Sequence, residues 1–183
     1  MKMQLLSATL ALAFAASAQT AATPPASQPD AAAKASATTL PYSSACDGYF
    51  VKNTYKIPAS KVGCLWLNSQ AEFDQVFQLA PPMMYSKPNK PISMAGAVAF
   101  AVVYEGSTIP QFKMIGVRVN NGVVEVAYKM SRPTPTKQDT AVYSMPLIVV
   151  VNKSALDKAG GAKSVRFIEN GKEAGTAPAP GNK

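Results

Sequence analysis

The dipeptide Asn121-Gly122 constrains the fold of this chain more than any other sequence feature. Asn-Gly favours a type I′ turn, in which both central residues have positive φ and two antiparallel strands meet. Residues 112–120 and 123–131 are rich in β-branched and aromatic residues and are therefore predicted to pair as a hairpin. Alternation gives each arm one apolar face, formed by Ile115, Val117 and Val119 on the first arm and by Val124, Val126, Tyr128 and Met130 on the second.

Three further stretches of the chain are predicted to form β-strands. Residues 96–106, GAVAFAVVYEG, are apolar almost throughout and are bounded by glycines, which is typical of a strand buried on both faces. Residues 147–151 form a second apolar run, and Pro146 marks the start of that strand or a sheet edge, because proline cannot donate to a sheet ladder. A second Asn-Gly turn, at Asn170-Gly171, follows a short third strand.

One amphipathic helix is predicted over residues 68–80. Ser69 and Glu72 form a capping-box pattern, apolar side chains follow at helical spacing, and the helix must end before Pro81. Trp66, just before this helix, is expected to pack in the core rather than to contact a ligand. The order of these elements predicts an α+β domain: a mostly antiparallel β-sheet of at least four strands with an N-terminal helix packed on one face.

Composition divides the chain into four segments. Residues 1–18 have an early lysine, a short apolar run and an Ala-Ser-Ala ending, which is the pattern of a secretory signal peptide. Residues 19–39 hold mainly Ala, Pro, Ser and Thr, and residues 174–183 are similar, so both segments are expected to be a disordered linker and tail. Residues 40–173 are left as a single domain.

Export sets the expected location of the mature protein and the state of its cysteines. No apolar run is long enough to cross about 30 Å of hydrocarbon, so we expect a periplasmic or secreted protein without a transmembrane segment. Thiols are normally oxidised outside the cytoplasm, so Cys46 and Cys64 are predicted to form a structural disulfide bond. A reactive thiol pair would need the closer Cys-x-x-Cys spacing or a nearby histidine.

The chain contains no histidine, which excludes more functions than any motif suggests. Ser-His-Asp and Cys-His catalytic arrangements cannot be built, and tetrahedral zinc sites lose their usual ligands. A pair of carboxylates, or a Ser-Lys nucleophile at Ser154 and Lys158, stays open, but solvated charge and chance spacing explain both better. We therefore expect a protein that is not an enzyme and needs no metal or cofactor. The carboxylates considered are Glu72, Asp74, Glu105, Glu125 and Asp139.

The charge balance of the chain is basic. Lysine and arginine number 18 against 10 aspartates and glutamates, and the net charge is +8. An exported basic protein meets anionic envelope surfaces such as phospholipid headgroups and lipopolysaccharide, so weak contact with them is expected. A nucleic-acid-binding protein would show a focused basic patch with interleaved aromatic residues, whereas these lysines are spread along the sequence. We therefore expect a protein partner rather than nucleic acid.

The stretch from Lys129 to Lys137 concentrates three cations around two prolines. In one interpretation it is a strand connection whose prolines stiffen it and whose charges keep it hydrated. In the other interpretation, a rigid cationic segment held between two strands is a preorganised recognition element. The candidate partner-binding residues are Lys129, Arg132, Pro133, Pro135 and Lys137.

A longer pattern runs through residues 67–153. It consists of S-x-x-E-F-x-x-V-F from Ser69, a buried strand that ends in glycine, the hairpin, a proline-containing polar loop and YSMPLIVVVNK from Tyr143. This pattern resembles the C-terminal domain of the PrcB family, although STIPQFKM, residues 107–114, departs from the family's Thr-Gly-Gly-Tyr type turn, with Phe112 in the place of the aromatic residue. The resemblance implies an exported accessory protein that stabilises a secreted protease complex.

Two functions are consistent with these features. The first is an exported, non-catalytic accessory or binding module that associates with and stabilises a secreted or envelope protein, for example a protease. The alternative is a disulfide-braced inhibitor that presents the proline-stiffened loop to the active site of a protease or another hydrolase. An accessory protein should preserve or raise the activity of its partner, whereas an inhibitor should lower it.

Overall fold

The computed structural model describes residues 37–46, 48–81, 90–135 and 141–181, and all of them belong to one compact unit. This part of the chain is mostly β, with sheets of four and five strands, which confirms the predicted sheet of at least four strands. The predicted signal peptide, residues 1–18, and nearly all of the predicted linker lie outside the described residues.

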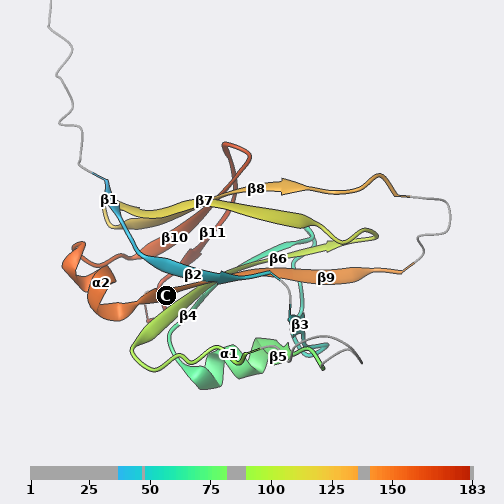
Figure 1. Ribbon diagram of the computed structural model, residues 1–183, viewed down its shortest axis with the longest axis horizontal. Helices are drawn as coiled ribbons and strands as arrows, with labels where there is room; N and C mark the ends of the chain where they lie inside the picture. The colour runs from blue at the N-terminus through green and yellow to red at the C-terminus, as the bar shows by residue number, and fades with distance from the viewer. Residues whose placement is uncertain (1–36, 47, 82–89, 136–140, 182–183) are drawn as a thin grey trace, which may run out of the picture. The chain divides into compact units, whose positions relative to one another are not determined.

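Two sheets face each other (Figure 1). The five-stranded sheet contains, in spatial order, β1 (Thr38–Thr39), β7 (Gln111–Asn120), β8 (Val123–Ser131), β10 (Ser164–Glu169) and β11 (Lys172–Pro178). The four-stranded sheet contains β2 (Tyr42–Ala45), β9 (Tyr143–Asn152), β6 (Ala97–Gly106) and β4 (Val62–Leu67). All neighbouring strands in the two sheets are antiparallel except β8 and β10, which are parallel.

The two sheets meet along both sides of this sandwich. β1 and β2 are separated only by Leu40 and Pro41, so the chain passes directly from one sheet into the other. On the opposite side β11 lies against β4. A Cβ atom added at Gly175 of β11 would lie 2.7 Å from the Sγ atom of Cys64, so this seam has room only for glycine.

The main core lies between the sheets, and a second core lies on the other face of the four-stranded sheet. Strand β6 contributes to both, because Val98 and Phe100 belong to the main core while Ala99 and Ala101 belong to the second. The predicted strand buried on both faces is thus confirmed. Trp66 packs edge-to-face on Phe100, with ring centroids 4.9 Å apart, as expected of a core residue.

The second core is covered by α1 (Gln70–Val76) and by a small sheet of β3 (Tyr49–Val51) and β5 (Phe77–Leu79). These elements lie on the side of the four-stranded sheet that faces away from the five-stranded sheet (Figure 1). The predicted capping box is confirmed: the Glu72 N–H donates to Ser69 Oγ at 3.2 Å, and the Glu72 carboxylate accepts from the Asn68 N–H at 2.6 Å.

The helix differs from the prediction in length and in place. It ends at Val76 rather than near residue 80, because Phe77 is extended and begins the strand that pairs with β3. Four strands precede the helix, so it is not the N-terminal element of the domain, and the predicted α+β arrangement is wrong on this point. The capping pattern locates the start of the helix, whereas a strand distant in the sequence decides its end.

The predicted hairpin is confirmed at its turn and corrected on one face. Asn121 and Gly122 have φ values of 50° and 73°, and Asn120 pairs with Val123. The register shifts between Met114 and Gly116, so Ile115 is an extra residue on β7. Ile115 is 58% exposed and does not share the buried face of the strand, contrary to the alternation expected from the sequence.

Both predicted domain boundaries change. Thr38–Thr39 form β1, two residues before the predicted start at residue 40. Asn170-Gly171 forms the predicted second turn, but the chain continues as β11 through Pro178, so residues 174–178 are not a disordered tail. Residues 174–178 of this last strand have small side chains, which fit where β11 lies against β4. Pro146 lies in the part of β9 that β2 does not cover, which confirms its predicted edge position.

Candidate functional site

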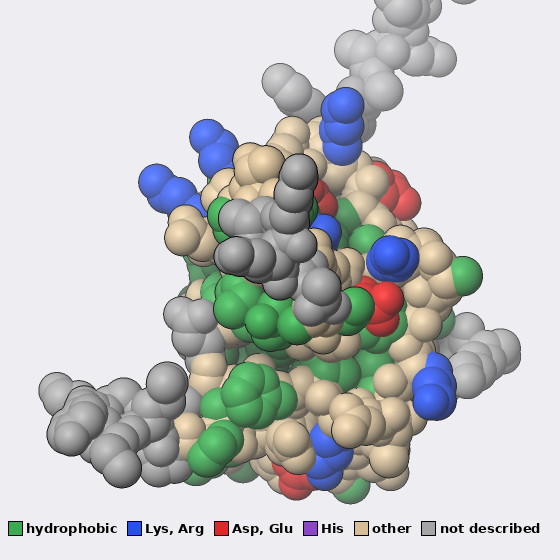
Figure 2. Space-filling model, turned by 90° about the vertical axis from the view of Figure 1, so that its right-hand side faces the viewer, with side chains coloured by type: hydrophobic (Ala, Val, Ile, Leu, Met, Phe, Trp, Pro, Cys, Tyr) green, Lys and Arg blue, Asp and Glu red, His purple; other side chains and the backbone are tan. Residues whose placement is uncertain are grey.

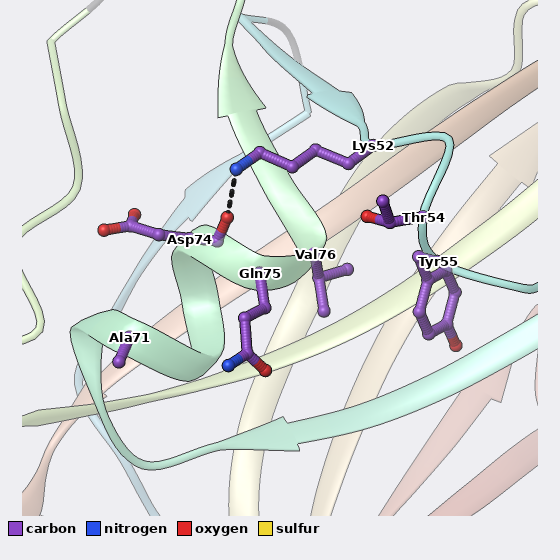
Figure 3. Close-up of a pocket in the computed structure, with 7 residues that line it drawn as sticks. All are labelled: Lys52, Thr54, Tyr55, Ala71, Asp74, Gln75 and Val76. Carbon is purple, nitrogen blue, oxygen red and sulfur yellow. Dashed lines mark hydrogen bonds between the residues drawn. The ribbon is translucent and has the colours of Figure 1, made fainter.

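A hollow of about 630 Å³ lies between α1 and the loop after β3 (Figure 3). Lys52 Nζ donates to the main-chain carbonyl of Asp74, and the Asp74 carboxylate turns away from the loop and accepts from Gln70 Nε2 at 2.9 Å. Burial, with a smaller contribution from Cys64, raises the pKa of Tyr55, so its hydroxyl stays protonated at neutral pH. These polar groups therefore do not converge on one point of the hollow.

A second hollow, of about 450 Å³, lies at the end of the β7–β8 hairpin that is distant from its turn. Its lining residues are Gln111, Phe112, Lys113, Lys129, Met130, Ser131 and Asn170. Arg132 directly follows β8 at the same end. We call Phe112, Lys113, Lys129, Met130 and Arg132 the hairpin-end site. This site contains two of the predicted partner-binding residues.

The other predicted partner-binding residues do not line this hollow. Pro133 and Pro135 are exposed in the segment that leaves β8, and Lys137 lies outside the described residues. The structure therefore places Lys129 in the lining of the hollow and Arg132 at the same end of β8, and the partner-binding role of all five residues stays a prediction.

Lys113 and Lys129 stand directly opposite each other in the antiparallel ladder, and both are exposed. Their Cβ atoms are expected to be about 5 Å apart, and like charges in such a pair destabilise a sheet. Among the residues that the structure describes, no carboxylate forms an ion pair with either lysine or with Arg132. Lys113 and Lys129 are thus presented together without a neutralising carboxylate among the described residues.

Arg132 folds back across the end of the sandwich. Its guanidinium carbon lies 5.2 Å from the centre of the Tyr104 ring, within the range of a cation–π interaction. A Cβ atom added at Gly106 would lie 3.0 Å from Arg132 Nη1, so the guanidinium also contacts the end of β6. A residue that follows β8 in one sheet is therefore held against β6 in the other.

Beneath Arg132, Tyr104 and Tyr128 connect the two sheets by a hydrogen bond. Their hydroxyl oxygens are 2.5 Å apart, and Tyr104 donates to Glu169 Oε2 at 2.6 Å. A tyrosine hydroxyl has one proton, so Tyr128 must be the donor to Tyr104. The side chains of Tyr104 and Tyr128 are 3% and 0% exposed. We call this chain of three side chains the Tyr-Tyr-Glu relay.

The pKa values of both tyrosines in the relay are raised. Burial is the largest cause that raises the pKa of Tyr104, followed by its hydrogen bonds to Glu169 and Tyr128. Burial also raises the pKa of Tyr128, although the hydrogen bond to Tyr104 partly offsets the effect. Both hydroxyls therefore stay protonated at neutral pH. The Phe112 ring contacts both tyrosines, with centroids 5.8 and 6.1 Å away, so the relay supports the hairpin-end site from below.

Asn170 connects the β10–β11 turn to the same site. Its Nδ2 atom donates to the Met130 carbonyl at 3.1 Å, and its Oδ1 atom accepts from the Met130 N–H at 3.2 Å. Its main-chain N–H donates to the Tyr128 carbonyl at 3.0 Å. The side chain of Asn170 therefore extends the parallel β8–β10 ladder by one residue and holds the end of β8 in place.

Figure 2 shows the end of the molecule at which β8 ends and β9 begins. Hydrophobic side chains gather in the middle of this face, and Lys and Arg side chains are spaced around them rather than fused into one patch. An apolar centre with a charged rim is the usual composition of a protein-binding surface.

The residues considered as catalytic candidates have structural contacts. Ser154 lies at the start of α2 (Lys153–Lys158), and its Oγ atom donates to Asn152 Oδ1, the cap of that helix, at 2.8 Å. Glu125 is 6% exposed and pairs with Arg118 at 2.5 Å, which corrects the expectation of a solvated charge. In the described ranges no group of three or more Cys, Asp or Glu side chains is placed to hold a metal ion.

The remaining carboxylates are dispersed. Glu72 and Asp74 lie on α1 and accept the hydrogen bonds given above, and Glu105 lies near the end of β6. Asp139 lies outside the described residues. The structure therefore does not bring the described carboxylates together as a pair that faces a common hollow.

The predicted disulfide bond between Cys46 and Cys64 is contradicted by the structure. Cys46 directly follows Ala45 of β2, and Cys64 lies in β4, at the opposite edge of the four-stranded sheet. The register places Ala45 and Leu65 in one row across β9 and β6. Three strand spacings of about 4.8 Å separate the cysteines by about 14 Å, twice the Cα distance that a disulfide allows.

Comparisons with known protein families, with curated proteins and with solved structures found no match. The resemblance to the PrcB family therefore stays a prediction from the sequence pattern. None of the helices among the described residues is both long enough and apolar enough to cross a membrane.

Several residues of the site were not predicted from the sequence. Lys113 lies in the first arm of the predicted hairpin with no motif around it, and Tyr104 and Glu169 lie in other predicted strands or turns. A count back from the Asn121-Gly122 turn would pair Lys113 with Met130. The bulge at Ile115 shifts the pairing by one and brings Lys113 opposite Lys129. The isolated glycine Gly116, next to Ile115, is a sequence signal of a bulge that the prediction did not use.

Proposed function

We propose that this protein is an exported, non-catalytic accessory module that binds and stabilises a protein partner through the hairpin-end site. The observation that carries the proposal is the facing pair of Lys113 and Lys129, which line a hollow and have no carboxylate paired to them among the described residues. Phe112 and Met130 also line this hollow, and their side chains pack against the main core. Aromatic residues, Met and Arg are enriched at protein interfaces.

The energetics of the cations favour an acidic partner. Repulsion between Lys113 and Lys129 costs the isolated protein stability, and a carboxylate placed between them would replace that repulsion by attraction. Arg132 is already stacked on Tyr104, so it loses little conformational entropy when a partner binds. The site is therefore prepared for a negatively charged segment before the partner arrives.

The location and the kind of partner complete the proposal. The signal pattern of residues 1–18 supports export to the periplasm or to the medium, where weak contact with anionic surfaces accompanies specific binding. The PrcB-like pattern supports a secreted protease as the partner. The inhibitor alternative relied on a disulfide brace, and Cys46 and Cys64 do not form one here, so the accessory role is the one that we propose.

Affinity purification tests the proposal. The mature protein is crosslinked at low salt in an envelope extract of its source organism, and the captured proteins are identified by mass spectrometry. The double variant Lys113→Glu/Lys129→Glu is compared with Lys158→Glu/Lys163→Glu, which changes the net charge equally. Lys158 and Lys163 are exposed near α2. The main-chain N–H of Lys163 donates to the Gly122 carbonyl at 2.8 Å, so this lysine lies at the turn end of the hairpin, away from the hairpin-end site.

We expect the parent and the control variant, Lys158→Glu/Lys163→Glu, to capture one protein in near-stoichiometric amount. The variant Lys113→Glu/Lys129→Glu should fail to capture it. Equal capture by both variants, or a diffuse set of anionic components released by moderate salt, would contradict the proposal. The captured partner is then assayed for activity and heat inactivation with and without the protein. Preserved activity and slower inactivation indicate a stabiliser, and reduced activity indicates an inhibitor.

A further inference from the structure

The first half of β7 is an open sheet edge. β1 pairs with β7 only at Arg118 and Val119, and the Leu40 N–H adds one hydrogen bond to the Val117 carbonyl at 2.9 Å. In the part of the chain that the structure describes, no strand pairs with residues 111–116 on this side. Such an edge presents main-chain donors and acceptors to any extended segment that reaches it.

The register of β8 shows which of its main-chain groups point toward β7. The Tyr128 carbonyl accepts from the Asn170 N–H at 3.0 Å, so Tyr128 directs its main-chain groups toward β10. Neighbouring residues of a strand point in opposite directions, so Lys129 directs its groups toward β7. Lys129 is paired with Lys113, which makes this a hydrogen-bonded pair of the ladder.

The same alternation identifies the outward groups of β7. Because Lys113 directs its N–H and carbonyl toward β8, its neighbours Phe112 and Met114 direct theirs to the open side. Phe112 and Met114 pack their side chains against the main core, whereas the Lys113 side chain lies on the exposed face of the sheet. The open edge thus combines two residues with available main-chain groups and one cation between them.

We propose that an acidic, extended segment of the protein partner adds to this edge as an antiparallel strand. The inference rests on the proposed function and names the mode of binding at the same site. The added strand exchanges main-chain hydrogen bonds with Phe112 and Met114 and continues the antiparallel orientation that β1 has on this edge. Its acidic side chains lie on the exposed face, opposite Lys113 and near Lys129.

The positive charge at this edge favours an acidic segment of another protein over a second copy of this chain. Two copies of this chain that paired through so short an edge would bring their Lys113 side chains together, and like charges oppose that pairing. The bulge at Ile115 ends the regular edge, so only a short segment can add. An acidic segment of another protein meets both conditions, because it is short and neutralises Lys113 and Lys129.

Strand addition predicts a specific alternation in the bound segment. In an antiparallel pair, residues opposite each other both point their main-chain groups toward the partner strand or both point them away. Segment residues opposite Phe112 and Met114 therefore direct their N–H groups to β7 and their side chains to the apolar side. The residue opposite Lys113 directs its N–H away and carries the acidic side chain.

A short synthetic peptide of alternating glutamate and valine tests this alternation with the full mature chain. Two derivatives keep the same side chains, one with N-methyl groups on the valines and the other with N-methyl groups on the glutamates. We expect valine methylation to weaken binding by about tenfold or more, because it removes the hydrogen bonds to β7. Glutamate methylation should leave the affinity nearly unchanged. Equal effects, or a larger effect at the glutamates, would overturn the inference.

Two further measurements locate the binding and separate the two proposals. Peptide binding should slow amide hydrogen exchange at Phe112 and Met114, and Lys113→Glu should weaken binding whereas Lys158→Glu should not. If the envelope partner is captured through Lys113 and Lys129 but both methylated peptides bind equally, the proposed function stands and strand addition is wrong. Absence of any peptide binding also overturns strand addition. Loss of partner capture in the parent would overturn the proposed function itself.

Discussion

The direction of the hydrogen bonds in the Tyr-Tyr-Glu relay predicts which tyrosine hydroxyl contributes more to the free energy of unfolding. Tyr104 is the central member, since it accepts from Tyr128 and donates to Glu169. The change Tyr104→Phe removes only the hydroxyl and leaves the ring that packs under Arg132. The Tyr128 hydroxyl, which is fully buried, then loses its acceptor.

The magnitude follows from the cost of a buried donor without a partner. Such a group costs about 1–3 kcal/mol, so we expect Tyr104→Phe to lower the free energy of unfolding by about 2 kcal/mol. This corresponds to a fall in melting temperature of roughly 4–8 °C for a domain of this size. Tyr128→Phe removes the terminal donor and leaves Tyr104 bonded to Glu169, so it should cost only about 1 kcal/mol.

The double variant distinguishes this reasoning from simple loss of packing. When both hydroxyls are absent, no buried tyrosine donor is left without an acceptor, so the double variant should be about as stable as Tyr104→Phe alone. Urea unfolding followed by circular dichroism measures all three variants, and equal slopes of the transitions establish that the unfolded state is unchanged. Additive effects, or a larger effect of Tyr128→Phe than of Tyr104→Phe, would refute the proposed direction of the relay.

The β4–β11 seam yields two further predictions. Burial, with a smaller contribution from the Glu173 carboxylate, raises the pKa of Cys64 from 9.0 to about 11, so the folded state holds this proton more tightly than the unfolded chain. The stability that this shift contributes is complete below pH 9 and is lost as the pH rises toward 11. The free energy of unfolding should therefore fall across this pH range in the parent protein and should fall less in Cys64→Ala. The same pH profile in both proteins would contradict the assignment. Gly175→Ala should destabilise the domain by about 1–3 kcal/mol because its Cβ atom would meet Cys64 Sγ. The cost should largely disappear when Cys64→Ala is added, and additive losses in chemical unfolding would show that the contact is not the cause.

The elements that sequence reasoning located correctly depend on residues that are close together in the chain. The Asn121-Gly122 and Asn170-Gly171 turns need positive φ at adjacent positions, and the capping box needs Ser69 and Glu72 three residues apart. The apolar run of β6 predicts burial on both faces because its alternate residues are all small or apolar. Each of these signals operates over a few residues, so the sequence alone is sufficient to find it.

The errors concern contacts between strands that are distant in the chain. The helix ends at Val76 because β5 pairs with β3, and the small residues of the last strand are ordered because they lie against β4. The disulfide was predicted from the expected oxidising compartment alone. The distance between Cys46 and Cys64 depends on the strand order of the sheet, which the sequence does not show. Strand order in a sheet is set by the global packing of the chain, and local propensity does not specify it.

The candidate site illustrates the same division. Composition and the loop sequence indicated that Lys129 and Arg132 belong to a cationic element, because charge and proline content can be read directly from the chain. That Lys113 stands opposite Lys129 depends on one extra residue in β7, and that Arg132 is held in place depends on Tyr104 from the opposite sheet. A single-residue shift of register changes which side chains stand opposite each other, and two facing sheets bring together residues that share no local pattern. The chemical character of the site is therefore present in the sequence, whereas its geometry arises only when the two sheets pack.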